Sequence, residues 1–572
     1  MPTAANITVR ETLDLLDGPF AELSEGVSQA RYAFWLGSGI SRERVDDLRR
    51  VIRKVLVHLQ TRIDAADPNC PYRRALEEAL ALAQLSPSEL GQVDPAQSVD
   101  TWGALDVVLQ RLPREYSRLL DIRVQGQAAD YLLWDAVDVP TTFAPAAAEP
   151  DCEHLCLGIL GIEGVAPEVV SANWDGLIEA AVAQLTAGGN DVLLVCVRGE
   201  DLREPRRRSR LIKFHGCAVR AANDAATYRP LIVARLSQIT QWPVDPSTAP
   251  IREQLVNLAV TNPTLMIGLS AQDTNIQHTF AAAQARMAWP WPSHPPAHVF
   301  AEDALGNDQR NILRYVYRTA YDTNGAAVEV SALLRAFAKP LFVSLVLHVA
   351  ASKLTTLASL AEAPGLGPAD RQNIQNGILH FRNRIADAGN GDRLTFMRSY
   401  VGLTSRALRM FREGRPADAS TRVYRAFGSA PRHQIAADPA IHTSGLRELA
   451  VALGLLGLGE FDNAWHLTAG TRTDGKDGIL EAQVSGHPAR IYLAANADAA
   501  LTLEAEAIVT ENDGDAVIIH STAPPVRQAR SPRAAPGRTG APAPRHVDMR
   551  GLLGSATGLP DLRRRFREEA VL

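Results

Sequence analysis

The chain has 572 residues, which is too long for one hydrophobic core, so about two to four domains are expected. Hydrophobic residues make up 46% of the chain and charged residues 22%, proportions typical of a soluble globular protein. The formal net charge of -5 gives no indication of nucleic acid or an anionic membrane as a partner.

The cysteines and the apolar runs indicate the cellular compartment. The chain has an odd number of cysteines, without the spacing of a disulfide framework: Cys70, Cys152, Cys156, Cys196 and Cys217. Its first residues lack the basic and apolar regions of a signal peptide. The longest apolar run, residues 340–352, is interrupted by His348 and is too short to cross a membrane. A reduced, cytoplasmic protein without membrane contact is therefore expected.

The first α/β signal is an apolar run followed by a glycine turn, Phe34-Trp35-Leu36-Gly37-Ser38-Gly39-Ile40-Ser41. Residues 7–31 before it have the pattern of an amphipathic helix. The run predicts a buried strand, and the glycines allow a sharp turn into a helix-forming segment. Backbone N–H groups at a helix start lack intrahelical partners and suit a diphosphate. The alternative is an ordinary strand-to-helix turn of an α/β domain.

Strands and helices then alternate along the chain. Strands are predicted at residues 169–172, 192–197, 211–214, 265–267 and 298–301, and helices at 176–185, 251–260, 274–287 and 307–318. This alternation predicts a doubly wound, mostly parallel, Rossmann-like sheet whose ligands lie at the carboxyl ends of the strands. Residues 42–165 have apolar positions at helical spacing and are predicted to form a helical insert in this domain.

The residues after 330 differ in pattern from the α/β part. Residues 331–475 are predicted to be helical. Within them, residues 407–424 and 450–466 each have the pattern helix, glycine turn, helix, which is typical of tetratricopeptide-like pairs, with generic helical hairpins as the alternative. Residues 476–522 predict a small β or α+β unit, with strand-like runs at 480–483, 489–494, 507–509 and 516–519. The Pro-, Ala- and Arg-rich residues 523–546 predict a disordered linker before a terminal helix in residues 547–572.

Four short motifs follow predicted strands, and their order is informative. They are Gly37-Ser38-Gly39-Ile40-Ser41, Ser171-Ala172-Asn173-Trp174-Asp175, Lys213-Phe214-His215-Gly216 and Gly268-Leu269-Ser270. This set resembles the sirtuin family, which has a Gly-Ala-Gly-x-Ser loop, an Asn-x-Asp, a His-Gly and a later Gly-x-Ser. The resemblance covers about residues 30–320 and implies a sirtuin-like catalytic domain in residues 1–330.

The resemblance implies NAD as the substrate and gives the motif residues their roles. The nucleotide would be held by Gly37, Ser38, Gly39, Ile40, Ser41, Gly268 and Ser270. The bond that breaks joins a cationic nicotinamide to the anomeric carbon of ribose, so the leaving group departs neutral and needs no general acid. Asn173 would orient a water at the ribose, Asp175 would stabilise the developing positive charge, and His215 would accept a proton.

The residues proposed for catalysis also have structural interpretations. Asn173 and Asp175 could cap the helix that follows them, because both residue types are frequent caps. His215 could be a satisfied core histidine. Asp273 is interpreted as a helix cap and Trp174 as a packing residue, so neither is assigned to the site.

The chain departs from the deacylating sirtuins at three places. After His215 it has Cys217 but no paired Cys-x-x-Cys, so no bound zinc is expected. The Phe-Gly-Glu stretch that helps to hold an acyl-lysine peptide is absent. After Ser41, the usual Gly-Ile-Pro-Asp-Phe-Arg is replaced by Arg42-Glu43-Arg44-Val45-Asp46-Asp47.

Loss of the zinc module and the peptide cleft leaves water as the acceptor. This profile resembles the defence-associated bacterial sirtuins, which are similar to NAD glycohydrolases fused to sensor or partner domains, and it implies NAD depletion during phage infection. The implied partners are NAD, further copies of the chain, and a phage-derived or operon-encoded trigger protein. Two alternatives stay open: a catalytically silent nucleotide-binding sensor or scaffold, and an NAD-dependent protein deacylase or ADP-ribosyltransferase.

Overall fold

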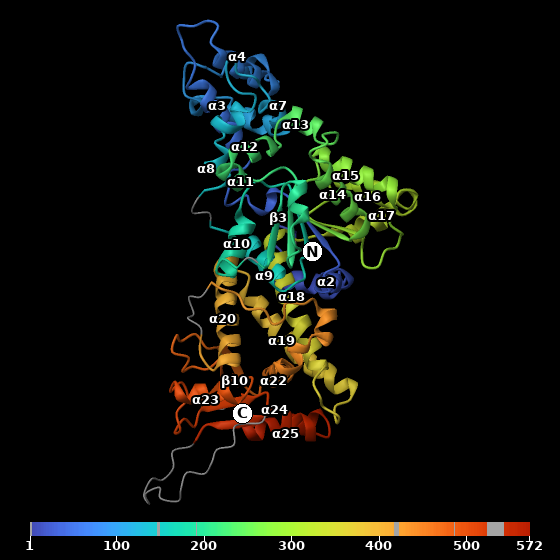
Figure 1. Cartoon of the computed structure of the whole chain (residues 1–572), viewed down its shortest axis with the longest axis vertical. Helices are drawn as coiled ribbons and strands as arrows, with labels where there is room; N and C mark the ends of the chain where they lie inside the picture. The colour runs from blue at the N-terminus through green and yellow to red at the C-terminus, as the bar shows by residue number, and fades with distance from the viewer. Residues whose placement is uncertain (1–2, 146–148, 190, 417–421, 485–486, 523–542) are drawn as a thin grey trace, which may run out of the picture.

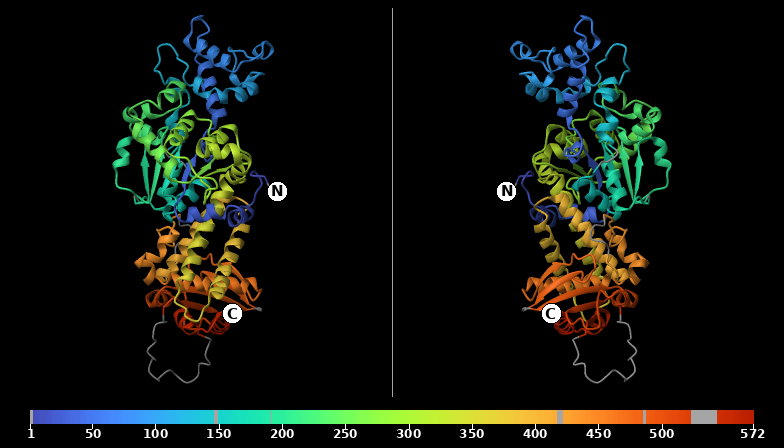
Figure 2. Two further views of the ribbon diagram at one scale, coloured as in Figure 1. Left: turned by 90° about the vertical axis from the view of Figure 1, so that its right-hand side faces the viewer. Right: turned by 90° about the vertical axis from the view of Figure 1, so that its left-hand side faces the viewer.

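The computed structural model describes residues 3–145, 149–189, 191–416, 422–484, 487–522 and 543–572. Figure 1 shows an elongated molecule with a group of helices at one end, a parallel sheet in the middle and a smaller sheet at the other end. The two views of Figure 2 show long helices between the sheets, among them α18 (Ala338–Ser359) and α19 (Pro368–Ala388).

The central sheet has seven strands, all parallel, in the order β3-β4-β2-β1-β5-β6-β7. They are β1 (Ala33–Leu36), β2 (Glu168–Ser171), β3 (Leu193–Cys196), β4 (Ser209–Lys213), β5 (Thr264–Ile267), β6 (His298–Ala301) and β7 (Leu333–Leu334). Helices cover both faces, so the predicted doubly wound α/β fold is confirmed. The strand order reverses beside β1, with β2 on one side and β5 on the other.

Side chains of the central strand alternate between two buried faces, as the strand geometry requires. On one face Phe34 stacks on Phe342 of α18, with ring centroids 6.4 Å apart. On the other face Trp35 packs on Phe280 of α15 (Thr274–Arg286) at 5.0 Å. Because both faces are covered, these strands are continuous apolar runs rather than alternating ones. The first face is covered by α1 (Val9–Asp17), α2 (Ala21–Ser28), α9 (Cys152–Ile162), α10 (Leu177–Leu185) and α18, and the second by α14 (Ala249–Thr261), α15, α16 (Asn307–Tyr317) and α17 (Thr319–Ala332).

The sheet domain does not end at residue 330, where the sequence predicted its boundary. β7 pairs with β6 beyond that point, and α18 packs on the sheet together with α1 and α9. By length and composition α18 could cross a membrane, but most of it is buried inside the protein, as in the core helix of a soluble protein. The boundary was predicted too early because β7 has only two residues and leaves no periodic signal.

The helices after the first glycine turn share a hydrophobic core with α11 (Ala218–Asn223) and with Ile232 and Ala234, and this insert ends before the predicted residue 165. Its helices are α3 (Leu48–Gln60), α4 (Pro71–Leu82), α5 (Pro87–Leu90), α6 (Leu105–Arg111), α7 (Tyr116–Leu119) and α8 (Val139–Phe143). The next helix, α9, has all its residues buried and lies on the central sheet. Helical periodicity alone does not distinguish α9 from the insert.

The tetratricopeptide-like pair predicted in residues 450–466 is wrong, whereas the pair predicted in residues 407–424 is not tested, because its second helix falls on residues outside the described part of the chain. α20 (Arg393–Glu413) and α22 (Leu446–Phe461) are single long helices, and residues 417–421 lie outside the described part of the chain. The glycines inside α22 serve packing rather than turns. A Cβ on Gly457 would lie 2.2 Å from the carbonyl oxygen of Gly377 in α19. Glycine is therefore required by the close approach of two helices.

The C-terminal sheet has five strands in the order β12-β11-β10-β9-β8, with both parallel and antiparallel pairs. They are β8 (His466–Ala469), β9 (Leu480–Val484), β10 (His487–Ala494), β11 (Ala516–His520) and β12 (Arg545–Asp548). Three of the predicted runs are strands, whereas residues 507–509 form a turn after α23 (Ala497–Ala505). The predicted linker falls outside the described residues from 523 to 542, and its last residues begin β12. The predicted terminal helix is two helices, α24 (Met549–Ser555) and α25 (Leu559–Ala570).

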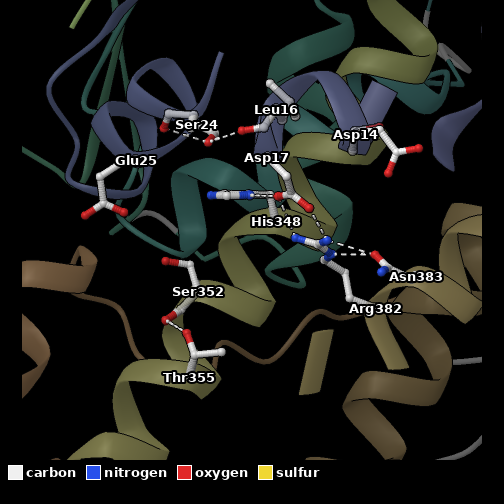
Figure 3. A network of polar contacts seen from close by, with 12 residues as sticks. Asp14, Leu16, Asp17, Ser24, Glu25, His348, Ser352, Thr355, Arg382 and Asn383 are labelled. Atoms are coloured by element: carbon white, nitrogen blue, oxygen red, sulfur yellow. Dashed lines mark hydrogen bonds and ion pairs between the residues drawn. The ribbon is translucent and has the colours of Figure 1, made fainter. Parts of the chain in front are cut away.

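A polar network joins the N-terminal helices to the helices of the C-terminal part (Figure 3). Arg382 of α19 donates from Nη1 to Oδ1 of Asp17 at 2.9 Å, and Nδ1 of His348 in α18 lies 3.6 Å from the same oxygen. Arg382 also donates from Nε to Asn383 at 3.1 Å. Burial raises the pKa of Asp17, but His348 and Arg382 together lower it more, to about 2. The ionised carboxylate therefore fixes α1 against both α18 and α19.

His298 is expected to make folding sensitive to acid. Its ring lies fully buried between Phe280 and Trp289, and in the described part of the chain neither ring nitrogen has a hydrogen-bond partner. Burial lowers its pKa to about 3. The unfolded chain, with an ordinary value of about 6.5, therefore binds more protons as the pH falls below about 6.5, and stability is lost there.

The variant His298→Phe should be at least as stable as the parent at neutral pH, because it removes two unpaired polar atoms. Between about pH 6.5 and about pH 4.5 it should lose less stability than the parent in urea unfolding. The exposed His278 provides the control, since His278→Phe should leave the acid sensitivity unchanged. If the parent and His298→Phe lost the same stability on acidification, His298 would not be the cause of the acid sensitivity.

Candidate active site

Two glycine turns meet at the carboxyl ends of β1 and β5. The N–H of Gly37 donates to the carbonyl oxygen of Ile267, and that of Gly39 to the carbonyl oxygen of Gly268, both at 3.1 Å. A Cβ on Gly37 would lie 2.3 Å from the carbonyl oxygen of Gly268. A Cβ on Gly39 would lie 2.6 Å from the Cα of Gly268. Gly268 itself has a φ of +62°. Glycine is required at all three positions because the two turns touch.

This contact lies at the point where the strand order reverses between β1 and β5. In open parallel sheets such a switch point is the usual position of a bound ligand. The structure therefore brings the first and last predicted motifs together at one edge of the sheet. Ile40 is buried under the turn, whereas Ser38 and Ser270 are exposed.

The N–H groups predicted to hold a diphosphate are engaged with the protein itself. That of Gly37 donates to Ile267 at the end of β5, that of Gly39 donates to Gly268, and that of Ser41 donates to the carbonyl oxygen of Ser38 at 3.1 Å. A phosphate at these amides would have to compete with the three bonds. The role of these residues in nucleotide binding stays a prediction.

Asn173 links the second motif to the first. Its Nδ2 donates to the carbonyl oxygen of Gly37 at 3.1 Å and to Oγ of Ser41 at 3.3 Å. Because a carbonyl oxygen only accepts, these contacts fix which end of the amide is which. Oδ1 is thus left as the acceptor of this side chain, which is the atom that the predicted role needs.

Asp175 directly precedes Gly176, the N-cap residue of α10, and binds the first N–H of that helix. Its Oδ1 accepts from the N–H of Leu177 at 3.1 Å, and the side chain is buried. Asp175 thus satisfies an N–H of the helix start without occupying the N-cap position, whereas Asn173 bonds to the glycine turn instead. A direct contact of Asp175 with a ligand would compete with this hydrogen bond.

The loop that holds Asn173 and Asp175 is tied to β4 by a buried lysine. Nζ of Lys213 donates to the carbonyl oxygens of Trp174, at 3.3 Å, and of Asp175, and to Oε1 of Glu179 at 2.8 Å. Burial lowers the pKa of Lys213, but the Glu179 carboxylate and its other partners raise it above its ordinary value. The ammonium therefore stays charged and holds the two loops together.

His215 follows β4 and is buried against the rings of Phe214 and Trp242. Its Nε2 lies 3.3 Å from Nδ2 of Asn275 and 3.6 Å from Oδ2 of Asp273. Burial lowers the pKa of His215, and the Asp273 carboxylate raises it by less. A neutral imidazole can accept a proton, and the nearby anion would stabilise the resulting cation.

Asn173 and His215 occupy matching places on neighbouring strands. Ser171 of β2 pairs with Lys213 of β4, and each candidate residue stands two positions beyond its strand's paired residue. Adjacent strands lie about 4.8 Å apart, so both residues belong to the same edge of the sheet. Residues 167–319 match the family model of a SIR2-like domain.

This segment is similar to a SIR2-like domain. The match confirms the predicted sirtuin-like family, and SIR2-like domains use NAD. It contains Asn173, His215 and Gly268, whereas the turn at Gly37 precedes it. No curated protein matches the chain.

Four of the five cysteines lie close to the central sheet, and two of these, Cys196 and Cys217, are within the matched residues 167–319. Cys152 and Cys156 lie one turn apart in α9, with sulfur atoms 4.0 Å apart, and Cys196 and Cys217 are also buried. Among the described residues no group of three or more His, Cys, Asp or Glu side chains is placed to hold a metal ion. The absence of zinc stays a prediction.

The unusual residues after Ser41 are explained by ion pairs with α9 and α18. Nε of Arg44 lies 3.2 Å from Oδ2 of Asp151, the residue that precedes α9. Lys339 of α18 lies 2.6 Å from Glu43 and 3.3 Å from Asp151. The charged loop is therefore held against two helices that pack on the central sheet.

Sequence reasoning missed three polar residues of this site. Asp273 caps α15, as predicted, but it also faces His215. Asn275 is fully buried beside His215, and within the described residues its Oδ1 has no partner. His154, in α9, lies 3.2 Å from Oγ of Ser41. The available signal was a polar side chain at a helix start next to a strand-end motif, which is also the signature of a cap.

Removal of the Lys213 charge is expected to destabilise the SIR2-like domain. Lys213→Met would leave Glu179 and the carbonyl oxygens of residues 174 and 175 without their shared donor. Breaking a buried ion pair from one side costs on the order of 3 kcal/mol. Glu179 is partly exposed, so Glu179→Gln should cost clearly less in the same urea titration. Unchanged stability of Lys213→Met would show that the lysine does not hold these loops.

Proposed function

We propose that the chain is an NAD-hydrolysing enzyme that cleaves NAD to nicotinamide and ADP-ribose. The observation that carries this proposal is the anchoring of Asn173 to Gly37 and Ser41 at the switch point of a SIR2-like sheet. An asparagine fixed at its Nδ2 end offers Oδ1 to a ribose hydroxyl or to a water molecule. His215, two residues past the neighbouring strand, supplies the base.

The reaction needs one bond to break and one to form. The glycosidic bond breaks and its electron pair goes to nicotinamide, which leaves neutral. Water then bonds to the anomeric carbon, and its proton passes to Nε2 of His215, where Asp273 stabilises the imidazolium. Asp175 contributes its negative charge from the start of α10 rather than by contact.

Water is proposed as the acceptor because the features that hold a peptide substrate are missing from the sequence. The paired Cys-x-x-Cys and the Phe-Gly-Glu stretch of deacylating sirtuins are both absent. A SIR2-like domain without them has no evident means to position an acyl-lysine. This favours hydrolysis over acyl transfer.

A second candidate function is a catalytically silent nucleotide-binding module. It is favoured by the amides of Gly37, Gly39 and Ser41, which all donate to carbonyl oxygens of the protein. A turn closed on itself in this way would hold a diphosphate weakly. Product analysis separates this candidate from the hydrolase.

For the cellular role we propose NAD depletion during phage infection, by a cytoplasmic protein that self-associates and answers a phage-derived or operon-encoded trigger. An unrestrained NAD hydrolase would kill its own cell, so its activity has to be held off until it is needed. The helix α18 supports such control, because its first turn pairs with the loop after Ser41 and its far end lies in the C-terminal core.

Replacement of either candidate catalytic residue should abolish NAD cleavage. Asn173→Ala removes the ribose-facing acceptor and His215→Ala the base, so each should lower kcat on the order of hundredfold or more. The matched controls Asn257→Ala and His278→Ala change exposed residues of α14 and α15 and should cleave at the parent rate. Parent-like rates of folded Asn173→Ala and His215→Ala would end the catalytic assignment.

The products formed from NAD decide among the candidate functions. Nicotinamide and ADP-ribose from NAD alone, separated by chromatography, are expected for the hydrolase. Acyl transfer would require an added acetylated peptide, and a silent module would bind NAD without forming product. The parent should be assayed in purified form and in extracts of phage-infected cells, so that an untriggered state is also sampled.

Self-association is expected of the full-length chain. Light scattering over a range of protein concentrations should give a mass that is a multiple of the chain mass. NAD cleavage should rise with the same concentration dependence if assembly activates the enzyme. A monomer at every concentration, with and without NAD, would contradict this part of the proposal.

A further inference from the structure

The first turn of α9 reaches the candidate active site through one side chain, His154. The ring is fully buried, and its Nε2 lies 3.2 Å from Oγ of Ser41, 113 positions away in sequence. His154 lies outside the matched residues 167–319 and outside the motifs found in the sequence. Its contact is with the last residue of the glycine turn, which Asn173 also contacts.

The hydrogen bonds around His154 determine where its proton lies. The N–H of Asp151 points at Nδ1 from 3.1 Å, and a backbone N–H only donates. Nδ1 must therefore hold a lone pair. Burial lowers the pKa of His154 to about 4, although the carboxylates of Asp175 and Asp151 raise it, so the ring is neutral at neutral pH. The single ring proton then lies on Nε2 and is donated to Ser41.

This assignment fixes the roles of the atoms around Ser41. Its Oγ receives the proton of His154 Nε2 and also accepts from Nδ2 of Asn173 at 3.3 Å. Both acceptor positions of the hydroxyl are thus used, and its own hydrogen remains for a third partner. Asn173 is held between two acceptors, Gly37 and Ser41, and cannot turn its Oδ1 inward without breaking both bonds.

We propose that His154 is a positioning residue of this site: it holds Ser41 as an acceptor and thereby keeps Oδ1 of Asn173 turned toward the substrate. The proposal deepens the proposed NAD hydrolysis and rests on it for its kinetic test. His154 touches neither NAD nor water in this scheme. It acts through Ser41 and Asn173.

The competing interpretation is that His154 only caps α9. Its Nδ1 accepts from the residue that precedes the helix, and Asp151 in turn accepts from the N–H of Cys152 at 2.7 Å, which together form a capping box. Capping uses Nδ1, whereas positioning uses Nε2. The two roles therefore depend on different atoms and can be separated by substitution.

A matched pair of variants makes this separation. The amide of glutamine reaches about as far as Nε2, so His154→Gln keeps a donor for Ser41 and loses the acceptor for Asp151. The amide of asparagine reaches about as far as Nδ1, so His154→Asn keeps the cap and loses the donor. The single variant Ser41→Ala and the double variant Ser41→Ala/His154→Asn complete a double-mutant cycle with His154→Asn and the parent.

Steady-state NAD cleavage by the folded full-length variants is the first measurement. His154→Asn should lower kcat roughly tenfold to hundredfold with little change in KM, because a misplaced Asn173 weakens the transition state rather than binding. His154→Gln should stay near the parent. In the Ser41→Ala background His154→Asn should cause no further loss. The proposal would be overturned if His154→Gln lowered kcat more than His154→Asn, or if both variants had the kcat of the parent.

A second measurement does not depend on catalysis. In protein with ¹⁵N-labelled histidine rings, the His154 signals, assigned by their loss in His154→Gln, should show a proton on Nε2 and none on Nδ1. Ser41→Ala should shift the Nε2 signal and leave Nδ1 in place. A proton on Nδ1, or an Nε2 signal unmoved by Ser41→Ala, would refute the positioning role. If the parent cleaves no NAD while these spectra hold, the proposed function fails and the hydrogen-bond assignment stands.

Discussion

The contact between the turns at Gly37–Gly39 and at Gly268 is the constraint on which the candidate site depends. Three glycines let two backbones approach to a distance that no Cβ would allow. This approach fixes the carbonyl oxygen of Gly37, which in turn orients the amide of Asn173. A side chain at any of the three positions would separate β1 from β5 at the switch point. The polar contacts of the site therefore follow from a packing requirement of the backbone.

Helix α18 transmits that local order to the rest of the molecule. Lys339 in its first turn pairs with the loop after the glycine turn, and His348 in its middle faces Asp17. Near its other end Lys353 is fully buried and donates to Oε2 of Glu163 at 2.5 Å and to the carbonyl oxygen of Gly428 at 2.6 Å. A buried ammonium without these partners would be strongly unfavourable, so the C-terminal residues are part of the support of the sheet domain.

Much of the fold and part of the site could be predicted from local sequence. A buried parallel strand is an apolar run, and the residue that follows it lies at the ligand-binding edge, which located Gly37, Asn173 and His215. Contacts between distant segments leave no such pattern. The glycines of α22 resemble turn residues, although they serve the approach of α19. Lys339 and His154 act across more than a hundred residues of sequence, and only the packing of their helices reveals them.

The two buried histidines of the site are neutral for the same reason but are suited to different tasks. Burial lowers the pKa of both His154 and His215. Protonation of Nδ1 in His154 would place it against the N–H of Asp151, a contact between two donors, so this ring cannot take up a proton without breaking the cap of α9.

At His215 the proton-accepting Nε2 also faces a donor, Nδ2 of Asn275, but the Asp273 carboxylate lies 3.6 Å away and can accept from the protonated ring. In the described residues Oδ1 of Asn275 has no partner while Nδ2 points at the neutral ring. A half-turn of this amide exchanges donor for acceptor, so Oδ1 then accepts the new proton of the imidazolium. After this half-turn Nδ2, rather than Oδ1, occupies the position without a partner, so it is the Asp273 carboxylate that favours the protonated ring. The surroundings of His215 therefore favour a proton acceptor, and those of His154 favour a fixed donor.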